Sequence, residues 1–372
     1  MIFPDYNRSV LNVACSVLKM FGAEPPHAAL PELASLPRKS HVALVILDGM
    51  GVDALSLLPE GAFLRRRQIA TLTSVCPSTT TAATGSLYSA LSPAEHGWLG
   101  WSCYFKEYAK LVDLFLDRDS YSHERLTSSP AKRLMPYDSV FTRIHRAADD
   151  RVLTRAVFPF EPSPLSGMGD TVIARDLDEA ALAVRSRDAR EAFTLFYWTD
   201  PDDTMHNFGA RSDRAAKVLA QLNAWAEALA PKLTDTTLII TADHGLIDVT
   251  EPVWLNECRE IMRCLVMPPS VESRAASLFV KRGREREFED AFREKLGADF
   301  LLMTREEALS RQLFGPGKMH EKADDFIGDY LALATGTRAI YYKAEGAEPH
   351  GKMIGHHAGL TEQEMLVPLI TA

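Results

Sequence analysis

Short apolar runs alternate with helical patterns along most of the chain. Five runs have the aliphatic and β-branched composition of buried strands: 42–47, 69–75, 152–158, 193–198 and 237–241. Apolar residues also recur at spacings of three and four, which predicts helices at 8–21, 178–190 and 218–229. Because strands that alternate with helices form parallel sheets covered on both faces, we predict an α/β fold with a mostly parallel sheet sandwiched by helices.

The pattern changes between residues 250 and 325. Prolines become frequent, two short strands are predicted at 277–280 and 300–303, and a helix with one charged face is predicted at 284–295. We expect 250–325 to form a small α+β insertion that caps the sheet.

This insertion divides the predicted core into residues 1–249 and 326–372. Two apolar runs follow it, at 331–334 and 339–342. We expect both runs to be strands that return the chain to the main sheet.

Composition and charge narrow the classes of function. The 372 residues include 41 Lys and Arg against 50 Asp and Glu, and 46% are apolar, which excludes a disordered or fibrous chain. No cationic block is longer than Arg65–Arg67, so a nucleic-acid polymer is not an expected partner. The five cysteines form no Cys-x-x-Cys pair, and neither a leader nor a long apolar run is present. We therefore expect a cytoplasmic protein with reduced thiols and no membrane span.

Acidic residues follow three of the predicted strands. Asp48 comes after 42–47, a group at 200–203 comes after 193–198, and Asp243 with His244 comes after 237–241. The carboxyl ends of parallel strands meet at one edge, where ligands bind in open α/β sheets. Carboxylates gathered there repel one another unless a cation lies among them, so the pattern predicts a metal site.

Histidines near these acids indicate which metal. Asp202 and His206 are four residues apart, so they face the same side of a helical turn. His357 follows His356 in a glycine-flanked segment near the C-terminus. Imidazole together with carboxylate suits Zn²⁺, with Mn²⁺ as a second choice. Taken singly, each motif has a simpler explanation: turn chemistry at Asp48, a surface hydrogen bond between Asp202 and His206, and a buried histidine at His244.

A nucleophile is predicted among the hydroxyls at 78–81. They follow the 69–75 strand and precede a segment of helical composition at 82–91. The positive end of a helix and its free N–H groups favour an oxyanion or a phosphate, and a nearby metal lowers the pKa of a hydroxyl. At least one of these hydroxyls is expected to serve only as the helix N-cap.

Together the motifs resemble the type I phosphodiesterase and nucleotide pyrophosphatase family of the alkaline phosphatase superfamily. The resemblance is carried from about residue 40 to the C-terminus by Asp48–Gly51, Pro77–Thr80, Pro93–Gly97, Asp202 with His206 and Gly209, Asp243–Gly245, and His357–Leu360. It implies that Asp202, His206 and His357 hold one ion. It also implies that Asp48, Thr80, Asp243 and His244 hold the other. By the same resemblance, two zinc ions about 4 Å apart serve a small phosphorylated substrate, and Thr80 attacks phosphorus to form a phosphothreonine intermediate.

One departure bears on the substrate. The resemblance places Trp101 where these enzymes usually carry an Asn that contacts a phosphoryl oxygen. A phosphomonoesterase or a phosphonate hydrolase on the same metal core is therefore the alternative to a phosphodiesterase. A sulfatase is disfavoured because no Arg follows Cys76 and Pro77 at the required spacing. A mutase of the same superfamily is also disfavoured, because those enzymes favour Ser as the nucleophile and this chain has Thr80. A catalytically silent binding protein is expected to lack ligands, and none of the seven is missing.

Overall fold

A computed structural model describes residues 1–161, 164–165, 167–185, 191–344 and 353–372. Its main sheet has seven strands. In spatial order they are β2 (Gln68–Thr73), β18 (Leu366–Thr371), β9 (Thr236–Thr241), β1 (His41–Leu47), β8 (Glu191–Trp198), β6 (Val152–Phe158) and β7 (Asp170–Ile173). All pairs from β9 to β7 are parallel, whereas β18 is antiparallel to both of its neighbours. The predicted mostly parallel sheet is confirmed.

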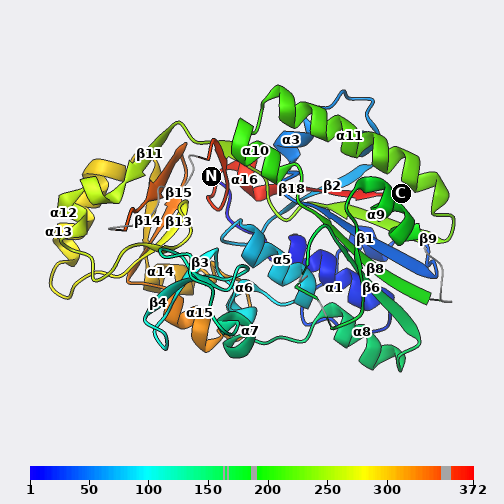
Figure 1. The fold of residues 1–372 in the computed structure, drawn as a ribbon, viewed down its shortest axis with the longest axis horizontal. Coiled ribbons are helices and arrows are strands. Elements are labelled where there is room, and N and C mark those ends of the chain that lie inside the picture. Colours follow the sequence, from blue (N-terminus) through cyan, green and yellow to red (C-terminus); the bar gives the residue numbers. More distant parts are fainter. Residues whose placement is uncertain (162–163, 166, 186–190, 345–352) are drawn as a thin grey trace.

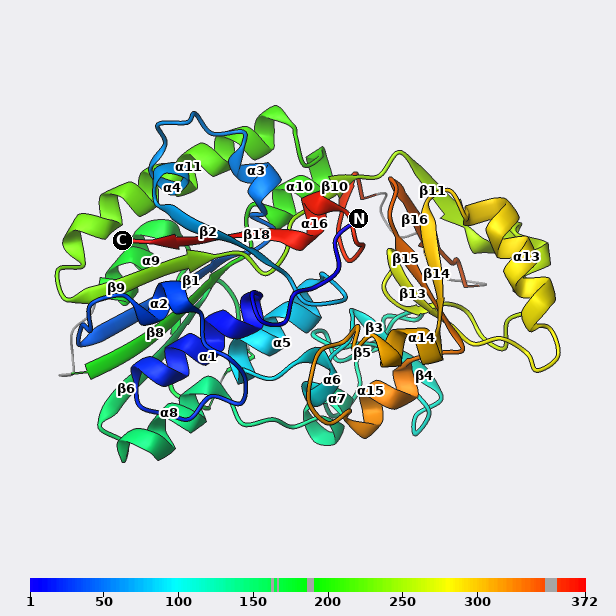
Figure 2. The ribbon, with the colours of Figure 1, turned by 180° about the vertical axis from the view of Figure 1, so that it is seen from behind.

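Helices cover both faces of this sheet (Figures 1 and 2). One face carries α1 (Val10–Met20), α5 (Thr80–Ser89) and α8 (Val140–Ala148), and the other carries α3 (Val52–Leu55), α4 (Phe63–Arg66) and α11 (Asp213–Leu229). A further helix, α9 (Leu177–Arg185), contacts β6 and β8. The predicted helix at 178–190 is confirmed as far as Arg185, and 186–190 lie outside the described residues. The apolar sides of these helices bury the β1 run, which is why its side chains are apolar on both faces.

A second sheet lies beyond the carboxyl ends of the parallel strands (Figure 1). Its order is β14 (Phe300–Thr304), β15 (Tyr330–Ala334), β13 (Ala275–Leu278), β12 (Ser270–Val271), β3 (Ser102–Phe105), β4 (Lys110–Asp113) and β5 (Arg118–Asp119). Every pair in it is antiparallel. Its strands thus come from two segments far apart in the chain.

The predicted return of 331–334 and 339–342 to the main sheet is wrong. The first run is β15, in the middle of the second sheet, and the second run is β16 (Arg338–Tyr341), which pairs with β11 (Glu251–Trp254). Apolar runs of this length carry no information about which sheet buries them, and here β15 lies between β14 and β13 with two apolar faces to cover. The boundaries of 250–325 as a folding unit stay a prediction.

The remaining elements are short and surround the two sheets. They are α2 (Pro31–Ala34), α6 (Pro93–His96), α7 (Pro130–Leu134), α10 (Asp202–Phe208), η1 (Ala230–Lys232), β10 (Ile247–Asp248), η2 (Leu255–Glu257), α12 (Arg259–Met262), α13 (Glu285–Leu296), α14 (Arg305–Ser310), α15 (Glu321–Phe326), β17 (Gly355–His356) and α16 (Glu362–Met365). Within the described ranges, none of the helices has the length and apolarity needed to cross a bilayer.

Candidate metal centre and active site

The turn after β1 brings Asp48 to the edge of the sheet. Leu47 is level with Trp198 in β8, and Ile46 is level with Thr241 in β9, so the three strands end together. Gly49 has φ +72°, and a Cβ there would lie 2.9 Å from the Cβ of Asp202. Only glycine allows both this left-handed conformation and this close approach. The sharp turn therefore holds Asp48 and Asp202 next to each other.

Hydrogen bonds fix one oxygen of Asp48 and one oxygen of Asp243. The Tyr197 hydroxyl donates to Asp48 Oδ2. The backbone N–H groups of Gly49 and His244 donate to Asp243 Oδ1, at 3.2 and 3.0 Å. The second oxygens, Asp48 Oδ1 and Asp243 Oδ2, are buried and have no hydrogen-bond partner among the described residues. Each carboxylate thus presents one free oxygen.

His244 lies between these oxygens and Thr80. Its Nε2 is 3.4 Å from Asp48 Oδ1, 3.5 Å from Asp243 Oδ2 and 3.0 Å from Thr80 Oγ1. Ligand atoms of Asp48, Asp243 and His244 all lie within 4.8 Å of one another. These three buried side chains can hold one metal ion.

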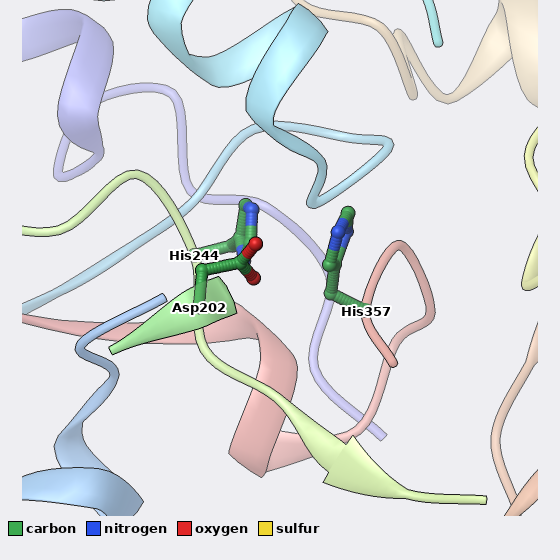
Figure 3. A group of neighbouring side chains, drawn as sticks. All are labelled: Asp202, His244 and His357. Atoms are coloured by element: carbon green, nitrogen blue, oxygen red, sulfur yellow. The ribbon is translucent and has the colours of Figure 1, made fainter. Parts of the chain in front are cut away.

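A second group forms from Asp202, His244 and His357, whose ligand atoms also lie within 4.8 Å of one another. Figure 3 shows Asp202 and His244 side by side, with His357 across from them. The two imidazole rings are stacked with centroids 3.9 Å apart. Asp202 Oδ1 and His357 Nδ1 are buried without a hydrogen-bond partner in the described part of the chain.

His206 stands at the margin of this second group. It is one helical turn after Asp202 in α10, and its Nε2 is 3.2 Å from Asp202 Oδ2. Its Nδ1 is 2.7 Å from the carbonyl oxygen of Gly355, so a proton on Nδ1 leaves Nε2 free to bind a cation. The spacing of four residues places Asp202 and His206 on the same side of α10, as the sequence predicted.

Thr80 is the first residue of α5, and Thr79 is the N-cap. The Thr80 hydroxyl lies beside His244, at the end of the helix where the first backbone N–H groups have no intrahelical acceptor. This position suits a group that acquires negative charge or holds a phosphate.

The protonation of these groups reflects their burial and crowding. Burial, together with Asp243 and Asp202, raises the pKa of Asp48 well above its ordinary value. Burial disfavours charge on His206 as well, but Asp202, the Gly355 carbonyl and Asp203 together outweigh burial and raise the pKa of His206 to about 9. Burial and the neighbouring His244 hold the pKa of His357 well below its ordinary value. Four orphaned ligand atoms among crowded carboxylates and imidazoles fit a site built for divalent cations, which resolve both the repulsion and the missing partners.

Two other histidines of the recognised motifs have their ring nitrogens occupied. His356 Nε2 is 2.7 Å from Ser273 Oγ, and its Nδ1 accepts the backbone N–H of His357. His96 packs against Gly85, and its nitrogens contact Ser86 Oγ and the backbone N–H of Trp98. Burial lowers the pKa of each imidazole to about 3. Both histidines shape the site without offering it a ligand atom.

A cavity of about 1110 Å³ opens onto the metal residues. Its lining includes Asp48, Thr80, Asp202, His206 and His357. Its other walls come mainly from the second sheet and adjoining loops, with aromatic side chains that include Trp98, Trp101, Phe115, Tyr121 and Tyr342. The second sheet therefore encloses much of the cavity in front of the two candidate metal groups.

The sequence patterns missed two polar residues of this site. Tyr197 is inside the apolar β8 run, where its hydroxyl gives no signal, yet it orients Asp48. Glu272 follows β12, and its Oε1 accepts hydrogen bonds from Thr79 Oγ1 and from the Trp101 N–H, both at 2.7 Å. Nothing in the local pattern around Glu272 distinguishes it from a surface acid, because its partners lie 193 and 171 residues away.

A fully buried ion pair anchors the segment that carries His357. The Arg274 guanidinium donates to both Glu364 oxygens, at 2.6 and 2.8 Å, and Glu364 accepts the backbone N–H of Gly359 at 2.7 Å. Both side chains have no exposed surface. The pair therefore links the second sheet to the loop between β17 and α16.

We expect Arg274→Met to lower the free energy of unfolding by about 3–5 kcal/mol, because Glu364 is left as an uncompensated buried charge. Urea unfolding followed by circular dichroism measures this. Arg293→Met is the matched control, since the pair of Arg293 with Asp290 is exposed, and its effect is expected to be far smaller. Equal losses in the two variants would contradict the anchoring role.

Residues 42–359 match the family described as type I phosphodiesterase / nucleotide pyrophosphatase. The match covers most of the chain and includes every residue of the metal groups. The chain belongs to this family. It is therefore a hydrolytic enzyme with an alkaline phosphatase-like fold, as the sequence motifs predicted. No curated protein matches the sequence.

Solved structures of similar fold come from two kinds of enzyme. The murine ectonucleotide pyrophosphatase / phosphodiesterase 5 is 17% identical, with a TM-score of 0.66 over 88% of this chain and 87% of that one. The human protein is also 17% identical, with a TM-score of 0.66 over 89% and 87%. The phosphonoacetate hydrolase from Sinorhizobium meliloti 1021, in complex with phosphonoformate, is 14% identical, with a TM-score of 0.64 over 90% of each chain. At these identities the similarity establishes the shared fold.

Proposed function

We propose that this family member is a two-metal phosphoryl hydrolase in which Thr80 is the nucleophile. Asp202, His206 and His357 hold one ion, and Asp48, Thr80, Asp243 and His244 hold the other, with Zn²⁺ favoured over Mn²⁺ by the mixed donors. The observation that carries this proposal is the set of four buried, unpartnered ligand atoms beside Thr80. A further support is that the murine relative is described as inactive in a Thr→Ala form bound to AMP.

Two bound ions would lower the pKa of the hydroxyl groups that ligate them and would neutralise negative charge at phosphorus. Thr80 loses its proton to solvent, its Oγ1 attacks phosphorus, and the ester oxygen opposite leaves with the P–O electron pair. Water then attacks the phosphothreonine in line and restores the Thr80 hydroxyl. Two inversions give net retention at phosphorus. The N-terminus of α5 stabilises the anionic group throughout.

A phosphodiester is the favoured substrate class, and a phosphonate is the second candidate. The phosphonate is considered because of Trp101, which stands where these enzymes usually carry an Asn. The Trp101 indole cannot make the amide contact of that Asn, and its backbone N–H already donates to Glu272. Turnover of bis-p-nitrophenyl phosphate, p-nitrophenyl phosphate and phosphonoacetate with added Zn²⁺ or Mn²⁺ tests the choice. A protein that turns over none of them under any metal condition is a silent homologue, and the proposal fails.

Metal uptake is expected to release protons. In the metal-free protein the pKa of His206 is raised to about 9, so His206 holds a proton near neutral pH, and ligation displaces that proton. The pKa of Asp48 is also raised, so ligation opposes protonation of Asp48 as well. Metal affinity should therefore fall as pH falls from 9 to 6. Calorimetric titration with Zn²⁺ in buffers of different ionisation enthalpy counts the protons released. A count of zero at pH 7 would contradict the assignment of His206 as a ligand.

A further inference from the structure

Glu272 is an acidic side chain in the substrate cavity that the metal groups do not use. It lines the same cavity as Thr80, Asp202 and His206. Its Oε1 is fixed by the Thr79 hydroxyl, next to the nucleophile, and by the Trp101 N–H. Within the described residues, no hydrogen-bond donor contacts its Oε2. The free oxygen is therefore available to whatever group occupies the space beside Thr80.

Glu272 has no Lys or Arg partner within the described ranges, and the cationic group that faces it is His206. Asp113, which also lines the cavity, is paired with Arg118 at 2.8 Å, whereas no ion pair with Glu272 is found among the described residues. Holding an unpaired carboxyl group in a partly buried position costs free energy. A neutral amide oxygen would accept the same two hydrogen bonds as Oε1 without this cost. The negative charge of Glu272 is therefore not needed for local structure, which indicates a role toward the substrate.

We infer that Glu272 is a specificity-determining residue, which disfavours dianionic phosphomonoesters and phosphonates relative to monoanionic phosphodiesters. The inference rests on the proposed function and adds a basis for its substrate class. A phosphodiester brings one negative charge to the site, and a phosphomonoester brings nearly two at pH 8. Because repulsion from a fixed carboxylate grows with the charge it faces, the monoester loses more affinity than the diester.

The ionisation of Glu272 agrees with this role at alkaline pH. Burial raises its pKa to about 7, against the opposing hydrogen bonds from Thr79 and Trp101. The other charged groups that face it are His206 from α10 and Asp113 from β4. An acid with this pKa is mostly a carboxylate at pH 8.5, and assays at that pH therefore test the charged form.

The test is the variant Glu272→Gln, which keeps the Oε1 acceptor and removes the charge. At pH 8.5 we expect kcat/KM for p-nitrophenyl phosphate to rise about tenfold, with bis-p-nitrophenyl phosphate changing less than about threefold. Calorimetry with inorganic phosphate provides a readout besides turnover, and its affinity for the zinc-loaded variant is expected to rise about tenfold. Glu124→Gln is the matched control, because Glu124 is exposed and outside the cavity lining.

The outcomes separate this inference from the proposed function. If the wild type turns over diester but Glu272→Gln leaves both the diester-to-monoester ratio and phosphate affinity unchanged, Glu272 has a structural role and the inference is overturned. If Glu124→Gln shifts the ratio equally, the effect belongs to overall charge, and the inference is again overturned. If the wild type turns over no ester while phosphate affinity still rises in Glu272→Gln, the proposed function fails and the charge discrimination stands. Equal melting temperatures of the variants exclude misfolding.

Discussion

The variant Thr80→Ala is expected to lose hydrolysis of every ester by about 10,000-fold while it keeps its metal content. Removing the hydroxyl eliminates the atom that forms the covalent bond to phosphorus, and the remaining site can only position a substrate. Thr80 supplies one of seven ligand atoms, so metal retention is expected to survive its loss. Steady-state kinetics and elemental analysis of the purified variant measure the two quantities.

Two further variants sharpen this test. Thr80→Ser keeps a hydroxyl on Cβ and should recover most of the activity. Thr81→Ala makes the same chemical change one residue later, at a buried hydroxyl that has no hydrogen-bond partner in the described structure and does not line the cavity. It should behave like the wild type. Full activity in Thr80→Ala, or a labelled phosphoprotein that persists in it, would exclude Thr80 as the nucleophile.

The variant His244→Ala is expected to lose both metal ions and about 1,000-fold in turnover. In the proposed assignment His244 holds one ion with Asp48, Asp243 and Thr80, and its Nε2 lies near all three. Its ring also stacks on His357 with centroids 3.9 Å apart, and both groups lie close to Asp202, so loss of the ring disturbs the other ion as well. His206→Ala should lose one ion, because His206 contacts only the Asp202 side of the site. Metal-to-protein ratios by mass spectrometry distinguish the two losses.

His356→Ala is the control for these histidine variants. His356 lies next to His357 in sequence, but Ser273 and the His357 backbone occupy its nitrogens. It should therefore keep two ions per chain. If His356→Ala lost metal as completely as His244→Ala, or if His244→Ala kept both ions, the ligand assignment would be wrong.

The sequence by itself determined the local elements and the chemistry at their ends. Apolar runs such as β1 and β9 can be recognised as strands from the sequence, because a strand buried on both faces tolerates few polar side chains. The residues that follow them, Asp48 and Asp243 with His244, were predictable as a metal edge because parallel strands end together. The sequence pattern therefore predicted that these residues meet at one edge of the sheet, and the structure brings them together there.

Only the tertiary structure decided which elements share a sheet and which side chains complete the site. The β15 run has the composition of a main-sheet strand, yet it pairs with β13 and β14, since hydrophobic burial has no direction and does not select a partner. Tyr197 and Glu272 reach their partners across 149 and 193 residues, respectively. Contacts of that range depend on how two sheets meet, and no local pattern of residues encodes that.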